Sequence, residues 1–272
     1  MNFSVAMCVY SKDDPIHFET AANSILNQTV PPSEVVLVVD GPVPEELDKV
    51  ITSFEQMESF HVIRSKENQG HGNARRIGLA ACQNELVAIM DADDISSADR
   101  FEKQLAFFAE DADLSIVGGN ITEFVGEPEN VIGKRVVPLY DSEIKKYLKK
   151  RCPMNLVTVM FKKSHIDKAG GFVDWYCEED YYLWVRMFLA GMKFANTEES
   201  LVNVRVGSDM YLRRGGVKYF KSEARLQKYM LQNKVIGFGT YVVNVIKRLI
   251  VQVLMPNRMR GWVFKKYARK SV

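Results

Sequence analysis

A short apolar run that ends in three aspartates constrains this chain more than any other stretch. Residues 86–90 read Leu-Val-Ala-Ile-Met, and Asp91, Asp93 and Asp94 follow. An apolar run without polar alternation is typical of a strand buried on both faces of a parallel sheet, although a buried helix shares the pattern. In open α/β sheets, ligands bind beyond the carboxyl ends of the strands. The aspartates are therefore expected at a ligand site.

Two interpretations of these aspartates remain open. Asp91 and Asp93 point the same way in extended backbone, and such close like charges repel unless a cation neutralises them. A hard divalent ion that also binds phosphate oxygens is the natural candidate. Alternatively, the acids cap a helix that begins near Ser97 or Asp99. An EF-hand is excluded, because Ser96 stands where its loop needs glycine and a strand pattern precedes the loop.

The chain alternates between strand and helix patterns. Strands are expected at residues 3–10, 35–39, 60–64, 86–90, 114–118 and 155–161, and helices at 15–26, 45–54, 73–82, 100–108 and from 177 onwards. The alternation predicts right-handed βαβ units and a parallel sheet. No glycine-rich dinucleotide fingerprint follows the first strand and no P-loop occurs, which disfavours a Rossmann dehydrogenase and a P-loop enzyme.

A second acidic cluster opens the helix that begins near residue 177. Glu178, Glu179 and Asp180 are consecutive, and two tyrosines and Trp184 follow. Acidic residues in a first turn stabilise the helix macrodipole. Three in a row beside aromatic residues exceed what capping requires, so we favour a functional role. A carboxylate at a helix N-terminus stays ionised, as a general base for a hydroxyl must.

Composition bounds the class of protein. The 272 residues, 47% of them hydrophobic, suffice for one large domain or a domain with an appendage. Four dispersed cysteines without a Cys-x-x-Cys pair argue against zinc and disulfides and fit a reducing cytoplasm. The N-terminus lacks the basic region of a signal peptide. Residues 224–272 carry eleven Lys and Arg and no acid, whereas the rest has a charge of −9, so we expect the tail to meet an anionic surface.

The tail itself has an amphipathic pattern. Residues 235–255 are mostly apolar, but Lys247 and Arg248 interrupt them, which disfavours a spanning helix. We expect a helix that lies in a membrane interface, followed by a basic segment with interleaved Trp262, Phe264 and Tyr267. A helix packed on the main domain is the alternative. Nucleic acid is not an expected partner, because no binding fold is recognisable.

Several stretches together resemble family 2 glycosyltransferases with the GT-A fold, and in particular the bacterial exopolysaccharide and capsule enzymes of the amylovoran type. The resemblance covers about residues 3–215. It is carried, in order, by VAMCVY at 5–10, SILNQT at 24–29, VVDGP at 38–42, NQG at 68–70, MDADD at 90–94, residues 155–171, and EDYYLW at 179–184. Each motif alone is weak, but the ordered set is specific.

The resemblance implies an α/β fold with a Rossmann-like, mostly parallel sheet, flanking helices and C-terminal amphipathic helices. It divides the chain into a GT-A domain at 1–234, with a nucleotide-binding half at about 1–120 and an acceptor half at about 121–234, and a basic tail at 235–272. The implied reaction is an inverting, metal-dependent transfer of a hexose from a nucleotide-diphosphate sugar, a UDP-sugar, to a growing surface polysaccharide. The implied acceptor is linked to a polyprenyl diphosphate, and the enzyme would sit on the anionic inner face of a bacterial plasma membrane.

Roles follow position by position from the resemblance. Tyr10 would face the nucleobase beside the backbone of Cys8 and Val9, Asp40 would bind base or ribose, and Arg75 would bind base or phosphate. Asp91, Ala92 and Asp93 match the Asp-x-Asp motif, in which the two aspartates contact the ribose and hold Mn²⁺ or Mg²⁺ on the diphosphate. Asp180 matches the catalytic base, with Glu179 and Trp184 in the acceptor site. The acidic pair usual before Gly41 is reduced to Asp40, which weakens the inference of base recognition there.

Three other functions compete with this one. A nucleotidyltransferase would typically have a glycine-rich loop after the first strand, and residues 10–14 contain no glycine. A non-catalytic module that binds nucleotide sugars or membrane surfaces would not need both Asp93 and Asp180. A glycosidase also uses two carboxylates, but not a nucleotide-like site with an Asp-x-Asp pair.

Overall fold

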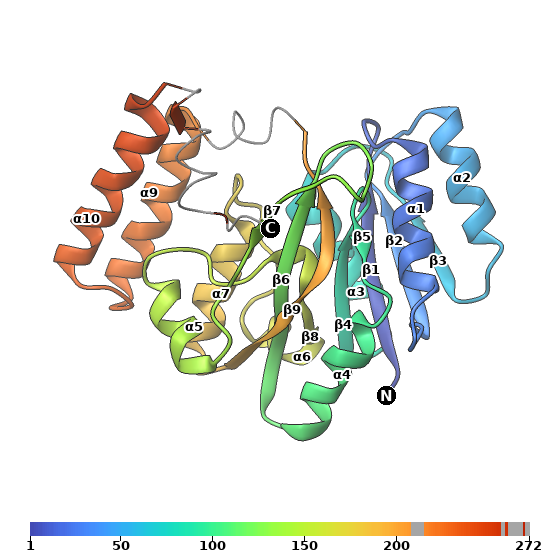
Figure 1. Cartoon of the computed structure of the whole chain (residues 1–272), viewed down its shortest axis with the longest axis horizontal. Helices are drawn as coiled ribbons and strands as arrows, with labels where there is room; N and C mark the ends of the chain where they lie inside the picture. Colours follow the sequence, from blue (N-terminus) through green and yellow to red (C-terminus); the bar gives the residue numbers. More distant parts are fainter. Residues whose placement is uncertain (208–214, 257–258, 261–268, 270–272) are drawn as a thin grey trace.

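The first four strands pair in parallel, as the alternating sequence pattern predicts. They are β1 (Phe3–Val9), β2 (Glu34–Val39), β3 (Phe60–Arg64) and β4 (Leu86–Asp91), in the spatial order β3-β2-β1-β4 (Figure 1). Every residue of β2 is buried, because helices cover both faces of the sheet. The computed structural model describes residues 1–207, 215–256, 259–260 and 269.

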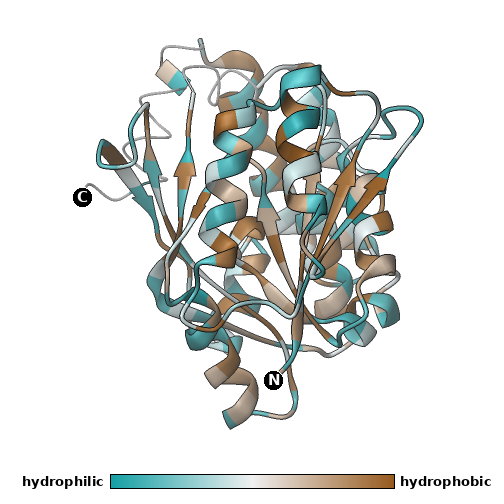
Figure 2. Ribbon diagram, turned by 90° about the vertical axis from the view of Figure 1, so that its right-hand side faces the viewer, coloured by the Kyte–Doolittle hydropathy of each residue, from teal (hydrophilic) through white to brown (hydrophobic). Residues whose placement is uncertain are grey.

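Two hydrophobic cores lie on the two faces of this sheet. Along β1, Phe3, Val5 and Met7 face one core and Ala6 faces the other, as the two-residue period of a strand requires. The first core includes α1 (Pro15–Leu26), α2 (Glu45–Glu55) and α4 (Arg100–Glu110); the second includes α3 (His71–Ala81), α5 (Asp141–Leu148), α6 (Lys163–Lys168) and α7 (Glu179–Leu189). Figure 2 shows the central strands as largely hydrophobic and the outward helix faces as hydrophilic.

The second half of the chain extends the same sheet with mixed pairing. Its strands are β5 (Ile95–Ser96), β6 (Leu114–Phe124), β7 (Val131–Arg135), β8 (Met160–Lys162) and β9 (Lys193–Arg205). The antiparallel strand β8 joins β4 to β6, and β9 then pairs with β6 in parallel. The strand predicted at residues 114–118 continues to residue 124. The predicted α/β class with a Rossmann-like sheet and flanking helices is confirmed; the first half of the sheet is parallel, whereas the second half mixes parallel and antiparallel pairs.

The prediction of a continuous strand at residues 155–161 is wrong. The chain there forms a 3₁₀ turn, η1 (Leu156–Thr158), before β8 begins. The Thr158 hydroxyl donates to the Asn155 carbonyl at 2.7 Å, and the Asn155 amide donates to the Gly119 carbonyl at 2.8 Å. Local side-chain hydrogen bonds of this kind compete with strand pairing and override the β-propensity of the Val-Thr-Val sequence.

The C-terminal helices lie side by side at one end of the molecule (Figure 1). They are α9 (Val217–Gln232) and α10 (Phe238–Leu249), and the π-helical turn η2 (Ile250–Leu254) continues α10. The Asn244 amide of α10 donates to Gln227 of α9 at 2.8 Å and to the Lys149 carbonyl at 2.9 Å. Residues 238–249 therefore pack on the main body, which was the alternative to a free interfacial tail.

The outer face of α10 and η2 is nevertheless apolar. Its exposed large side chains are those of Phe238, Val243, Ile246, Ile250 and Leu254. Within the described part of the chain, no helix has the length and apolar character needed to cross a bilayer. Trp262, Phe264 and Tyr267, which the membrane prediction also used, lie outside the described residues. One basic tail residue that is described, Arg269, forms a buried ion pair with Glu123 of β6.

The expected domain boundaries fall within continuous structure. Residue 120 lies inside β6, so this strand runs from the nucleotide-binding half into the acceptor half. The boundary at 234/235 falls in the loop between α9 and α10, which pack against each other. The division into a domain and a tail thus stays a prediction.

Candidate active site

Parallel pairing brings the ends of three strands to one edge of the sheet. The register places Cys8 of β1 beside Asp91 of β4 and Val9 beside Val39 of β2. Tyr10, Asp40 and Asp91 therefore come together where ligands bind in open α/β sheets. The apolar run and its aspartates predicted a ligand site at this carboxyl edge, and the fold brings the three residues together there.

Arg75 of α3 lies at the centre of this site. Its Nη1 donates to Glu179 Oε1 at 2.8 Å, and its Nη2 donates to Asp91 Oδ1 at 3.1 Å. The side chain is buried, which disfavours its charge, but Asp91 and Glu179 nonetheless raise the pKa of Arg75 above its ordinary value. The guanidinium thus joins the acidic motif after β4 to the start of α7. Its expected contact with base or phosphate stays a prediction.

The aspartates after β4 differ in surroundings. Asp93 is exposed, whereas Asp94 is 3% exposed and accepts the backbone N–H of Arg205 at 2.9 Å. Burial, followed by the charges of Asp93 and Asp91, raises the pKa of Asp94 well above its ordinary value. Asp94 therefore holds the loop. The helix-capping alternative is wrong, because α4 begins after Asp99 and shows no side-chain cap.

Asp13 is a site residue that the sequence interpretation missed. It lies in the turn after β1 and accepts the backbone N–H of Tyr10 at 2.9 Å. Burial, followed by the charges of Asp93 and Asp91, raises the pKa of Asp13 to about 6. The sequence signal for Asp13 is the Asp-Asp pair after the first strand. Asp14 of this pair caps α1 by accepting the N–H groups of Ile16 and His17, so the pair alone does not distinguish a site residue from a cap.

A buried cation lies beneath the acidic loop. Arg100 is wholly buried, and its Nη2 donates to the Ile89 carbonyl at 2.9 Å. Burial lowers the pKa of Arg100 to about 9, against the raising effect of Asp91 and Asp94, so the guanidinium is charged at neutral pH. It offsets part of the repulsion among the aspartates.

The donor set fits a divalent cation that is shared with a substrate. Among the described residues, no three His, Cys, Asp or Glu side chains form a closed metal cage. Mg²⁺ in phosphate-transferring sites is bound by one or two carboxylates together with substrate phosphates and water. Asp93 and Asp91, which are crowded by further carboxylates, meet this description.

Asp40 shapes the neighbouring loop. Its two carboxylate oxygens accept the backbone N–H groups of Gln69 at 2.7 Å and Gly70 at 3.0 Å, and the side chain is 5% exposed. The chain passes so close here that a Cβ on Gly41, whose φ is +90°, would lie 2.7 Å from the Asn68 nitrogen. The geometry gives Asp40 a positioning role, and its contact with base or ribose stays a prediction.

The other expected donor residues line the end of β1 and the acidic loop. The Tyr10 ring is half-buried and meets His71 edge-on, with the ring centroids 6.1 Å apart. Burial raises the pKa of the Cys8 thiol to about 12, which excludes a thiolate at neutral pH. Val9 and Ala92 are buried, so any contact with a donor would come through their backbone.

The start of α7 places Asp180 on the side of the site where the resemblance predicts the acceptor. Cys177 turns the chain with a left-handed φ of +58°, an uncommon conformation for a residue with a Cβ. Asp180 Oδ1 accepts the N–H of Tyr181 at 2.6 Å, and its Oδ2 lies 3.7 Å from the Cys152 sulfur. Glu179 is held by Arg75. Both acids therefore lie at the junction of the two halves.

The prediction that Trp184 contacts the acceptor is wrong. Its side chain is 0% exposed and packs in the core under α7. Residues four apart in a helix lie on the same face, so Trp184 lies one turn beyond Asp180. At that turn the face of α7 is already covered by the core. The aromatic residues that follow the three acids are therefore largely a packing feature.

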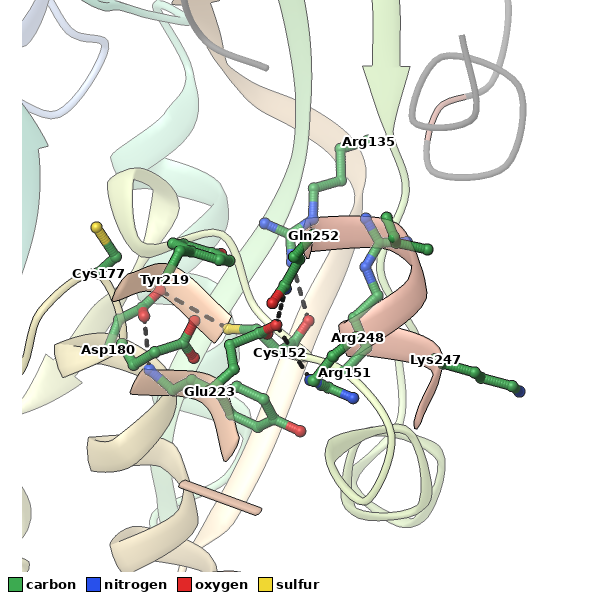
Figure 3. A pocket seen from close by; sticks show the side chains of 13 residues that line it. Arg135, Arg151, Cys152, Cys177, Asp180, Tyr219, Glu223, Lys247, Arg248 and Gln252 are labelled. Atoms are coloured by element: carbon green, nitrogen blue, oxygen red, sulfur yellow. Dashed lines mark hydrogen bonds and ion pairs between the residues drawn. The ribbon is translucent and has the colours of Figure 1, made fainter. Parts of the chain in front are cut away.

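A cavity of about 540 Å³ opens beside Asp180. Figure 3 shows Asp180 on one side of it and Arg135 and Arg248 on the other, while Lys247 extends away. Its remaining polar lining includes Arg151, Cys152, Glu178, Glu223 and Gln252. The sequence interpretation missed this lining, although the basic run Lys149-Lys150-Arg151 was a signal. These residues come from α7, α9, α10 and segments before and after α5, and no sequence period links them.

A close approach fixes α3 against the segment before α7. A Cβ on Gly72 would lie 2.9 Å from Asp174 Cα, closer than real contacts allow. Only glycine permits the backbone of α3 to come this near. The contact and the Arg75 bridge both connect α3 to the acceptor side.

Comparisons with known proteins establish the class of enzyme. The family model described as glycosyl transferase family 2 matches residues 4–167, and the related family group 2 model matches residues 86–264. The chain belongs to glycosyltransferase family 2 and is a glycosyltransferase. The predicted family and enzyme class are thus confirmed, and the nucleotidyltransferase and glycosidase alternatives are set aside.

Relatives and solved structures agree with this assignment. The chain is 36% identical over 268 residues to the Escherichia coli UDP-Gal:alpha-D-GlcNAc-diphosphoundecaprenol beta-1,3-galactosyltransferase, and the match covers 98% of this chain and 97% of that protein. It is 33% identical to the amylovoran biosynthesis glycosyltransferase AmsE of Erwinia amylovora, over 97% of this chain and 98% of the relative. A crystal structure of S. aureus TarS residues 1–349 with UDP-GlcNAc superposes with a TM-score of 0.70 at 14% identity, covering 97% of this chain and 79% of that one.

Proposed function

We propose that this enzyme transfers a hexose from a UDP-sugar to a hydroxyl of a saccharide carried on a polyprenyl diphosphate, by a metal-dependent inverting displacement. The observation that supports it best is the bridge from Asp91 through Arg75 to Glu179. It links the Asp-x-Asp motif to the start of the helix that carries Asp180, which supports a donor site and a base around one site. Transfer needs this arrangement, whereas a binding module needs only the donor side.

The residues divide the chemistry. Asp180 accepts the proton of the attacking hydroxyl, and direct attack on the anomeric carbon inverts its configuration. Asp91 and Asp93 would hold Mn²⁺ or Mg²⁺, which neutralises charge on the departing nucleoside diphosphate when it is bound. Asp40 and Arg75 keep the loop 68–70 and the start of α7 in place. Tyr10 lies where the nucleobase is expected.

The names of the relatives indicate which donor and acceptor to test first. The Escherichia coli relative carries a galactosyltransferase name with UDP-Gal as donor and a GlcNAc-diphosphoundecaprenol acceptor, and the match spans nearly both chains. UDP-galactose and a GlcNAc-diphosphate acceptor are therefore the first pair to test. An acceptor with a long lipid chain also agrees with the exposed apolar face of α10 and η2, which we propose lies at the surface of an anionic membrane inside the cell.

A nucleotide-release assay tests the proposal. UDP-galactose, then other UDP-, GDP- and dTDP-sugars, are offered with an alkyl diphosphate-linked GlcNAc acceptor, in Mn²⁺ or EDTA. We expect metal-dependent release that Asp180→Asn lowers by roughly 10²–10³-fold, because it removes the general base. Asp93→Ala is expected to remove release together with metal-dependent UDP binding.

Two controls make the outcome decisive. Asp167→Asn is the same change at an exposed aspartate of α6 and should leave release intact. Asp180→Asn should still bind UDP by calorimetry. Full turnover in Asp180→Asn, or full activity in EDTA, would contradict the mechanism. UDP binding without release from any sugar would favour the binding module.

A further inference from the structure

We propose that Arg135 and Arg151, in the cavity beside Asp180, bind the diphosphate of the lipid-linked acceptor. The proposal rests on the proposed function, because it names the part of the acceptor that this cavity receives. It assigns a role to side chains that the donor site and the catalytic base leave unused.

The first argument is charge. Arg135 Nη2 donates to the Cys152 carbonyl at 2.9 Å, but within the described residues neither Arg135 nor Arg151 forms an ion pair with a carboxylate. Burial, followed by the charge of Arg135, lowers the pKa of Arg151, which shows that the two cations are close enough to repel. The Arg135 Nε is also buried without a partner there. An anion between the two cations would offset the repulsion and supply the missing acceptor.

The second argument is that the acids of the cavity are already neutralised or committed. Glu223 pairs with Arg248 at 3.1 Å and accepts a hydrogen bond from Gln252. Burial, followed by the charges of Glu223 and Asp180, raises the pKa of Glu178 well above its ordinary value, which favours the neutral form of its carboxyl group. Asp180 is then the carboxylate left to act as a base. Within the described residues, the cavity therefore presents positive charge at Arg135 and Arg151 that no ion pair with a carboxylate offsets.

The third argument is distance from the reacting atoms. Cys152 connects the two groups, because its carbonyl accepts from Arg135 and its thiol donates to Asp180 Oδ2 at 3.7 Å. Cys152 therefore lies between the Arg135 guanidinium and the Asp180 carboxylate, and Arg151 is the residue that precedes Cys152. A sugar whose anomeric oxygen carries a diphosphate on Arg135 and Arg151 would place its other hydroxyls near Asp180.

The fourth argument is the route for the lipid. Val251 and Gln252 of η2 line the cavity, and Ile246, Ile250 and Leu254 on the same helical segment are exposed. An apolar chain that leaves the diphosphate would pass from the cavity onto this face. The arrangement suits a diphosphate carried on a long apolar chain better than a free inorganic anion, which has nothing to bury there.

A comparison of two acceptors tests the proposal. Transfer is measured to GlcNAc diphosphate with an alkyl chain and to the neutral alkyl GlcNAc glycoside, with Arg135→Gln, Arg151→Gln and the control Arg64→Gln, which changes an arginine at the end of β3. Each cavity variant should raise KM for the diphosphate acceptor by about tenfold or more, since charge-assisted hydrogen bonds are lost. KM for the UDP-sugar, and transfer to the neutral glycoside, should not change. Equal losses with both acceptors, or no loss with either, would overturn the proposal.

A binding measurement separates this proposal from the proposed function. Calorimetry without any donor compares geranyl diphosphate, inorganic pyrophosphate and geraniol, for the native chain and for Arg135→Gln/Arg151→Gln. We expect geranyl diphosphate to bind tightest and to lose at least tenfold in the double variant, even if no sugar is transferred. Pyrophosphate binding as tightly as geranyl diphosphate would overturn the assignment to a lipid-linked ligand. Confirmed transfer with binding insensitive to both arginines would overturn the assignment of this cavity alone.

Discussion

The two sides of the active site are built from opposite charges. On the donor side, Asp13, Asp91, Asp93 and Asp94 crowd together, and the nearby cations Arg75 and Arg100 compensate them only in part. On the acceptor side, Arg135 and Arg151 lie near each other without a carboxylate partner in the described structure. Within the described residues, each side thus carries like charges that neighbouring groups offset only in part.

The difference shows how a binding site can be found without a bound ligand. Excess like charge costs folding free energy, so a fold that keeps it must recover the cost when a partner binds. Among the described residues, carboxylates are in excess on the donor side and guanidinium groups are in excess at Arg135 and Arg151. The proposed metal-bound nucleotide sugar and the proposed diphosphate-linked acceptor would supply the opposite charges.

Replacing Arg75 should have the largest effect, because it breaks the connection between the two sides. Arg75→Met leaves Asp91 and Glu179 buried or half-buried without their cation, which we expect to cost about 3 kcal/mol of stability. For a chain of this size that is a fall of roughly 6–12 °C in the melting temperature. Arg76→Met is the matched control, since Arg76 is exposed on the same helix. Equal melting temperatures for the two variants would show that the bridge is not structural.

Changing the apolar face of α10 and η2 should have an intermediate effect that is confined to the acceptor side. Ile246→Ser/Ile250→Ser removes two exposed apolar side chains, and we expect about tenfold weaker binding to anionic vesicles in a flotation assay. Donor binding should not change. Ile16→Ser removes an exposed isoleucine of α1 at the far side of the molecule (Figure 1) and should leave vesicle binding intact. Loss with both variants would contradict a specific membrane face.

Deleting residues 236–272 would not be a clean test of membrane binding by the face of α10 and η2. Val235 and Ile236 are buried, and Asn244 joins α10 to α9 and to the Lys149 carbonyl. Removing α10 would therefore expose the core and alter the cavity. Point changes on the outer face keep the packing.

Neutralising Asp13 should have the smallest effect, and it measures the cost of like charge on the donor side. Because the folded-state pKa of about 6 lies above the ordinary 3.8, ionised Asp13 destabilises the free protein at high pH; this cost decreases as pH falls below 6 and disappears below about pH 3.8. Asp13→Asn should therefore raise the melting temperature by roughly 2–4 °C at pH 7.5, after allowance for solvent screening, and by less at pH 5.

The adjacent aspartate supplies the control for this experiment. Hydrogen bonds from the backbone N–H groups of His17 and Ile16 lower the pKa of Asp14, so its charge stabilises the protein at neutral pH. Asp14→Asn should not raise the melting temperature at any pH. An Asp13→Asn gain that is independent of pH would contradict the assignment to ionisation.

The donor side was largely predictable from the sequence, and the acceptor side was not. Residues that follow strands are brought together by the parallel sheet, so the apolar runs before Asp40 and Asp91 place them at one edge. Asp180 was found because three consecutive acids mark a helix start. Trp184 was misassigned because a helical face that begins at the surface can end in the core. Arg135, Arg151 and Cys152 are brought to Asp180 by tertiary packing, for which a single sequence contains no periodic signal.

The close packing of Gly72 on Asp174 has a consequence for substrate selection. Together with the Arg75 bridge, it ties α3 to both Asp91 and the start of α7, so we expect the spacing between the proposed metal site and the proposed base to stay the same for larger and smaller acceptors. An enzyme whose donor and acceptor groups keep a constant spacing selects acceptors by their fit to the rigid site and does not adapt its shape to them. Acceptors that differ from the native sugar in the position of one hydroxyl should therefore be rejected in the rate of transfer, even when their diphosphates bind equally well.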